Sequence, residues 1–186
     1  MTSMRDIAFH AEVDVCAVVY PSGHGPDALL EAFVLRRRAE GRDAVGLIQR
    51  RKGCADAPLE LALIGDDRAP KVSLPPRAGA GKALETVKTM LSARLRRRPD
   101  VLVLNRFGRA EVEGEGLWDV LADAVRIDIP VVIAVPDGLA AIWRRRGAGV
   151  LAQARPDADS LERWWRSVSA EVNDGDLTPR FCERAK

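Results

Sequence analysis

Two arginines and an asparagine follow an apolar run near the middle of the chain. The run Val101–Leu104 leads directly into Asn105 and Arg106, and Arg109 comes three residues later. A guanidinium makes paired, charge-assisted hydrogen bonds with oxyanions. Asparagine can hydrogen-bond a ligand but carries no charge with which to hold a metal ion. This segment therefore predicts a contact surface for a small anion and no metal site.

Three glutamates, Glu111, Glu113 and Glu115, alternate with other residues further along the same loop. In one interpretation Glu111 or Glu113 acts as a general base while an arginine holds an anionic substrate. In the other, the glutamates pair with the arginines and close the loop, which leaves them poor bases. The sequence keeps both open. The loop from Asn105 to Gly116 is long for a connection without an apolar pattern, and such loops are often functional.

A second candidate loop follows the apolar run Cys16–Tyr20, where a strand passes into a helix. It holds the small and polar residues Ser22, Gly23, His24 and Gly25. The phosphate-cradling pattern G-x-x-x-x-G-K-[ST] would place lysine and a hydroxyl residue next, but Pro26 and Asp27 stand there. Without the lysine charge, and with a carboxylate in its neighbourhood, ATP or GTP hydrolysis is not expected. A plain strand–turn–helix connection would explain the same glycines, and that alternative stays open.

Apolar runs alternate with helical patterns along the chain, and these elements must position the two loops. Strands are expected at 16–20, 44–48, 59–64, 71–74, 101–104 and 129–135, with a short element near 150–152. Helices are expected from 27 to about 40, and at 83–95, 117–125, 138–146 and 160–172. Strands that are apolar on both faces and alternate with helices predict an α/β fold. The expected form is a three-layer, mostly parallel open sheet with helices on both faces, which presents ligands at the carboxyl ends of its strands.

Composition restricts the class of protein further. Of 186 residues, 29 are lysine or arginine and 27 are aspartate or glutamate, so the formal net charge is only +2. We expect an extension at 1–12, a single domain at 13–172 and a polar tail at 173–186. No apolar run is long enough to cross a bilayer, and three widely spaced cysteines with two histidines make no disulfide framework or zinc site. A cytoplasmic protein without membrane contact is expected, and Cys54 is most simply an ordinary thiol.

Arginine triads at 36–38, 96–98 and 144–146 each end a predicted helix. Cations there neutralise the negative end of the helix dipole and bind its free carbonyls. In a parallel sheet we expect these ends on the side away from the ligand loops. Because aromatics are only 5% of the chain, no base-stacking surface accompanies the arginines, and nucleic-acid binding is not expected.

The segment Leu102–Gly116 resembles a signature of an uncharacterised bacterial family of small proteins, in which a strand ends in Asn, a basic residue, Phe and Gly. The runs Ala17–Tyr20, Val45–Gln49 and Ile129–Val135 are similar to neighbouring strands of that family. The family is related to P-loop nucleoside-triphosphatases and is often encoded near molybdate-transport genes. The resemblance implies a P-loop-like fold with degenerate nucleotide motifs, and it brings a nucleotide or an oxyanion such as molybdate into consideration.

These observations predict a non-hydrolysing protein that binds a small anion through Ser22–Gly25, Asn105, Arg106 and Arg109, with a role in molybdenum homeostasis implied by the resemblance. No catalytic residue or cofactor is assigned. One alternative is an enzyme that uses a loop glutamate and arginine on an anionic substrate. Another is a regulatory or interaction protein with a degenerate cleft. Trp164 and Trp165 on the last predicted helix favour a homodimer in that case.

Overall fold

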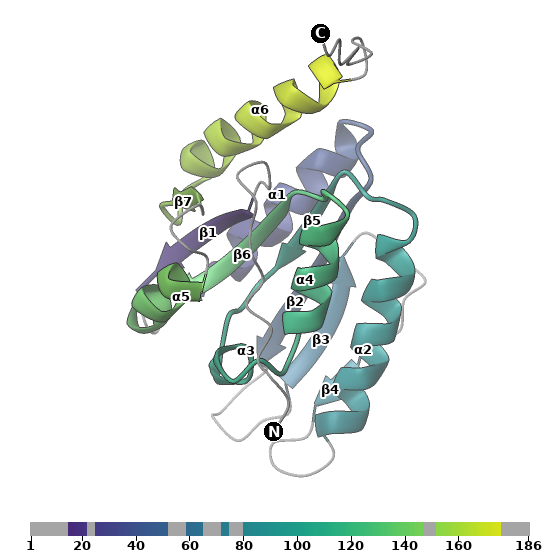
Figure 1. Cartoon of the computed structure of the whole chain (residues 1–186), viewed down its shortest axis with the longest axis vertical. Coiled ribbons are helices and arrows are strands. Elements are labelled where there is room, and N and C mark those ends of the chain that lie inside the picture. Colours follow the sequence, from purple (N-terminus) through teal and green to yellow (C-terminus); the bar gives the residue numbers. More distant parts are fainter. Residues whose placement is uncertain are drawn as a thin grey trace, which may run out of the picture.

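The computed structural model describes residues 15–21, 25–51, 59–64, 72–74, 80–146 and 152–175. The predicted extension, Ser22–His24, Cys54 and most of the predicted tail lie outside these residues. Within them the chain forms one seven-stranded sheet in the order β4-β3-β2-β5-β6-β1-β7 (Figure 1). The strands are β1 Val15–Tyr20, β2 Ala44–Arg51, β3 Leu59–Ile64, β4 Val72–Leu74, β5 Val101–Leu104, β6 Val131–Pro136 and β7 Ala152–Ala154.

The sheet is mostly parallel, as the sequence predicts. Strands β7, β1, β6, β5 and β2 run parallel to one another, whereas β3 is antiparallel to both β2 and β4 at one edge. Ile129 and Pro130 precede β6, so the predicted strand begins two residues too early. The reason is local: proline has no N–H to give to a ladder, and the Ile129 N–H donates to the Ala124 carbonyl at the end of the preceding helix (3.0 Å).

Helices cover both faces of the sheet. They are α1 Asp27–Ala39, α2 Ala80–Leu95, α3 Arg109–Val112, α4 Trp118–Arg126, α5 Ala140–Arg146 and α6 Ala158–Gly175, with a 3₁₀ turn at Asp137–Leu139. Residues of α2, α4 and α5 pack on one face, and residues of α1 and α6 pack on the other. In Figure 1, α2 and α4 lie in front of the sheet and α1 lies behind it. The short helix α3 is absent from the predicted elements.

Alternation along the central strands explains why they are apolar throughout. In β5, Leu102 and Leu104 point into the core under α2 and α4, whereas Val101 and Val103 point into the core under α1 and α6. Successive side chains in a strand point to opposite faces, so a strand covered on both sides needs apolar residues at every position. The predicted three-layer α/β fold is confirmed.

The arginine triads do more than neutralise helix ends. Arg37 is only 1% exposed, and its guanidinium contacts both carboxylate oxygens of Glu162 on α6 at 2.8 and 2.9 Å. It also lies over the rings of Phe33 and Trp165, at 5.0 and 5.5 Å from their centroids. The capping interpretation is therefore wrong for Arg37, which joins α1 to α6. Arg98 does bind a carbonyl at a helix end, that of Ile127 after α4 (2.8 Å).

Candidate functional site

At the carboxyl end of β5, the side chain of Asn105 connects this strand to β2 and to the start of α1. Its Nδ2 donates to Asp27 Oδ1 at the start of α1 (2.9 Å) and to the backbone carbonyl of Gln49 on β2 (3.1 Å). Because both partners are acceptors, the amide orientation is fixed by its hydrogen bonds. Asn105 is 1% exposed, and its Oδ1 has no hydrogen-bond partner in the described part of the chain. A buried acceptor without a donor is costly and rare in native proteins.

Tyr20 and Arg106 complete a group that we name the Asn105 cluster: Tyr20, Asp27, Asn105 and Arg106. Burial raises the pKa of the Tyr20 hydroxyl, while the charge of Arg106 and its hydrogen bond to that hydroxyl oppose the rise. The negative charge of Asp27 raises the Tyr20 pKa further. The ends of β1 and β5 and the start of α1 therefore bring two opposite charges, a phenol and an amide together at one edge of the sheet.

Gly25 lies beside this cluster, and a Cβ placed on it would come within 3.4 Å of Asp27 Oδ2. The Asp27 carboxylate sits in the first turn of α1, where the helix dipole favours negative charge. It thus places a negative charge at the end of the helix to which phosphates bind in phosphate-binding helices. Of the predicted site residues that the structure describes, Gly25, Asn105 and Arg106 are brought together. Arg109 is exposed at the start of α3, and no described contact joins it to the cluster.

Glu111 organises the loop that carries these arginines, and it does so through backbone groups. Its side chain is buried and accepts hydrogen bonds from the N–H groups of Gly108 and Leu117, both at 2.9 Å. The expected pairing with neighbouring arginines is therefore wrong for Glu111, since two backbone donors hold its carboxylate. Gly116 has a φ of +63°, and a Cβ there would overlap Glu111 Oε1. Glu113 and Glu115 are exposed.

An aromatic group holds the same loop against the core. Phe107 is fully buried, with its ring centroid 5.0 Å from that of Trp143 and 6.4 Å from that of Trp118. Arg146 lies 4.8 Å above the Trp118 ring and donates to the carbonyl of Val112 at the end of α3. The expectation that every triad lies away from the ligand edge is wrong here, because α5 is short and ends beside α3. Nothing in the local sequence links Arg146 to this loop, so sequence reasoning missed it.

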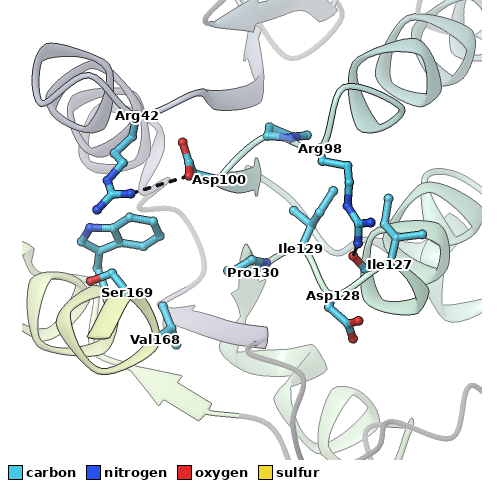
Figure 2. Close-up of a pocket in the computed structure, with 11 residues that line it drawn as sticks. Arg42, Arg98, Asp100, Ile127, Asp128, Ile129, Pro130, Val168 and Ser169 are labelled. Carbon is cyan, nitrogen blue, oxygen red and sulfur yellow. Dashed lines mark hydrogen bonds and ion pairs between the residues drawn. The ribbon is translucent and has the colours of Figure 1, made fainter. Parts of the chain in front are cut away.

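A cavity of about 180 Å³ lies at the opposite edge of the sheet, before β2, β5 and β6 (Figure 2). Figure 2 shows Arg42 and Asp100 paired across one side of it, with the guanidinium 3.8 Å from the carboxylate. Arg98 and Asp128 line the other side, with φ of +51° and +57°, and Trp165 also contributes to the wall. None of the predicted site residues lies here. Ligands of parallel α/β sheets bind at the carboxyl ends of the strands, so we assign the candidate site to the Asn105 cluster.

The groups in the Asn105 cluster are better suited to binding a ligand than to catalysis. Arg106 offers donors to an anion, and Asn105 offers a buried acceptor. Glu111, one of the two predicted bases, is held by the backbone. Among the described residues, no group of three or more His, Cys, Asp and Glu side chains is arranged to hold a metal ion. Similarly, no described helix is long and apolar enough to span a membrane.

Residues 15–164 match the model of a family described as "Protein of unknown function (DUF2478)". The chain belongs to the DUF2478 family. This DUF2478 chain is also 27% identical over 175 residues to the molybdenum import ATP-binding protein ModC 2 of Bradyrhizobium diazoefficiens. The alignment covers 87% of this chain but 19% of that protein, so the chain spans about a fifth of its relative's length. The likeness is compatible with a P-loop-like fold, and no solved structure matches the chain.

Proposed function

We propose that this DUF2478 protein binds a small anion, a nucleotide or an oxyanion, at the Asn105 cluster and does not hydrolyse nucleotides. The observation that carries the proposal is the buried, unpartnered Oδ1 of Asn105, in a cluster to which the next residue, Arg106, brings a positive charge. A buried acceptor without a protein donor is a point at which a bound water, ion or ligand can complete the hydrogen bonding. Its place at the carboxyl end of β5 is where this class of sheet presents ligands.

The absence of hydrolysis follows from the residues that replace the phosphate-binding motif. Pro26 carries neither a positive charge nor an N–H, and Asp27 is already hydrogen-bonded to Asn105. A catalytic nucleotide site needs a cation at the β- and γ-phosphates and a held magnesium ion. A carboxylate in the first turn of α1 opposes that polyphosphate, so binding of a smaller anion near Arg106 is the better fit. Ser22–His24 and Arg109 belong to the proposal as residues that flank the cluster in sequence.

Similarity to a molybdenum import protein makes molybdate one of the anions to test, and a role in molybdenum homeostasis is part of the proposal. A cytoplasmic location belongs to it as well, supported by the small, odd number of widely spaced cysteines in the sequence. The two alternatives have less support. Glu111 is held by the backbone, which leaves only the exposed Glu113 for the enzyme hypothesis. Trp164 and Trp165 pack in the core, so any self-association, measurable by light scattering, uses another surface.

Isothermal titration calorimetry tests the proposal, with ATP, GTP, phosphate, sulfate and molybdate as ligands. Loss of one charge-assisted contact costs about 1.5–3 kcal/mol, so Arg106→Gln should weaken binding by about 10- to 100-fold. The matched control is Arg97→Gln, which removes the same charge from an exposed residue after α2, at the opposite edge of the sheet. Absence of binding by every anion, or equal losses in the two variants, would contradict the proposal.

A further inference from the structure

We infer that the ligand of the Asn105 cluster carries a hydrogen-bond donor of its own beside its anionic oxygens, as hydrogen phosphate does. This inference rests on the proposed function, since it describes the anion that the cluster binds. It selects between oxyanions of similar size and charge, and it ranks molybdate below phosphate, so a role in molybdenum homeostasis would not depend on molybdate bound at this cluster. Near neutral pH, phosphate retains at least one proton, whereas sulfate and molybdate retain none. The prediction is that the protein prefers phosphate or a phosphate-like hydroxylated anion.

The hydrogen-bonding capacity that remains on Asn105 leads to this conclusion. Its two Nδ2 protons are committed, one to Asp27 Oδ1 at 2.9 Å and the other to the Gln49 carbonyl at 3.1 Å. The amide therefore has nothing left to donate to an oxyanion. What remains is Oδ1, which is buried and accepts no hydrogen bond from the described residues. Only a donor can satisfy it.

Charge in the cluster selects in the same direction. Arg106 supplies donors for anionic oxygens, but Asp27 places a second acceptor, with a full negative charge, beside Asn105. A fully deprotonated tetrahedral anion has only acceptors, so it would leave Asn105 Oδ1 unpaired and face the carboxylate without a proton between them. A protonated oxyanion donates from its hydroxyl and accepts from Arg106 with its other oxygens. Sites built to hydrogen-bond a ligand hydroxyl reject analogues that lack it, because buried groups are then left unpaired.

Inorganic phosphate and sulfate form the matched pair for the experiment, with molybdate as a third probe, all titrated calorimetrically near neutral pH. We expect phosphate to bind about 100-fold more tightly than sulfate or molybdate. Equal or tighter binding of sulfate or molybdate would overturn the inference while leaving the proposed anion site intact. The inference also falls, on its own, if ATP or GTP binds and none of the three ions does. If nothing binds at all, the proposed function fails and the inference fails with it.

Asp27→Asn provides a second, independent readout. The amide keeps an oxygen that can accept from Asn105 Nδ2, so the contact between β5 and α1 is retained, but the charge is replaced by a donor. Discrimination between phosphate and sulfate should therefore fall at least about tenfold. Asp159→Asn is the matched control, since Asp159 is an exposed aspartate in the first turn of α6. Discrimination that is unchanged in Asp27→Asn, or reduced equally in Asp159→Asn, would refute the assignment.

Discussion

Replacement of Glu111 by glutamine tests whether this side chain is a structural centre of the loop that carries Arg106 and Arg109. The substitution keeps the size of the side chain and removes its charge. In the structure both carboxylate oxygens accept from backbone N–H groups, that of Gly108 and that of Leu117, each at 2.9 Å. Glutamine retains one acceptor oxygen and turns the other position into a donor that faces an N–H.

The expected cost follows from these two contacts. A hydrogen bond to a charged group contributes about 1.5–3 kcal/mol, and a buried N–H left without an acceptor costs about 1–3 kcal/mol. Glu111 is 9% exposed, so water replaces little of what is lost. Glu111→Gln should therefore lower the free energy of unfolding by about 3 kcal/mol. Glu113→Gln, the same chemical change at an exposed position two residues away, should alter it by less than about 0.5 kcal/mol.

Urea denaturation followed by circular dichroism measures both variants at one pH. A destabilisation of Glu111→Gln that is no larger than that of Glu113→Gln would refute the structural role. The enzyme hypothesis is tested with the same proteins. If Glu113→Gln abolished a measured turnover on an anionic substrate without loss of stability, the exposed glutamate would be a catalytic base, and the binding-only proposal would be wrong.

Three further predictions concern the core and the cavity edge. Arg37 and Glu162 form a nearly buried ion pair at 2.8 Å, so a double-mutant cycle of Arg37→Met and Glu162→Gln in urea denaturation should give a coupling free energy of about 2 kcal/mol. A coupling below about 0.5 kcal/mol would contradict this prediction. Burial raises the pKa of the Cys16 thiol from 9.0 to about 12. The contribution of the buried neutral thiol to the free energy of unfolding is therefore complete below pH 9 and is lost as pH rises towards 12, by about 1.4 kcal/mol per pH unit. Cys16→Ala should make the free energy of unfolding less dependent on pH in this range. Asp128 has a φ of +57°, a conformation that glycine adopts without strain, so Asp128→Gly should raise the free energy of unfolding by about 0.5 kcal/mol and raise the urea midpoint. A lower midpoint would show that the aspartate side chain is needed.

Much of the fold is predictable from the sequence because its central strands are covered on both sides. Runs such as Val101–Leu104 and Val131–Val135 carry apolar residues at every position, a pattern that requires helices on both faces. Helix α3 could not be predicted, because its four residues are too few to show a period. The sequence predicts a helix cap at Arg37 because no local feature reveals Glu162, which lies 125 residues away and meets Arg37 only after α6 packs beside α1.

The sequence singles out some residues of the Asn105 cluster, but neither Tyr20 nor the contacts that join the cluster. The strand-end position of Asn105 and the charge of Arg106 are visible in the sequence, as is the departure from a phosphate-binding motif at Asp27. The hydrogen bond between Asn105 and Asp27 is not, because it spans 78 residues and depends on β5, β6 and β1 being neighbours. Likewise, the unpartnered Asn105 Oδ1 follows from geometry alone.

The most direct test of anion binding at the Asn105 cluster is a titration of the isotope-labelled protein with inorganic phosphate, in which the backbone amide chemical shifts are monitored by NMR. Binding at the Asn105 cluster predicts saturable shifts at Gly25, Asn105 and Arg106, with Arg98 and Asp128 at the opposite edge unaffected. Shifts confined to Arg98 and Asp128 would place the ligand in the cavity before β5 and β6 and contradict the claim. The claim would also be contradicted if none of the anions, that is phosphate, the nucleotides and the other oxyanions, caused any shift.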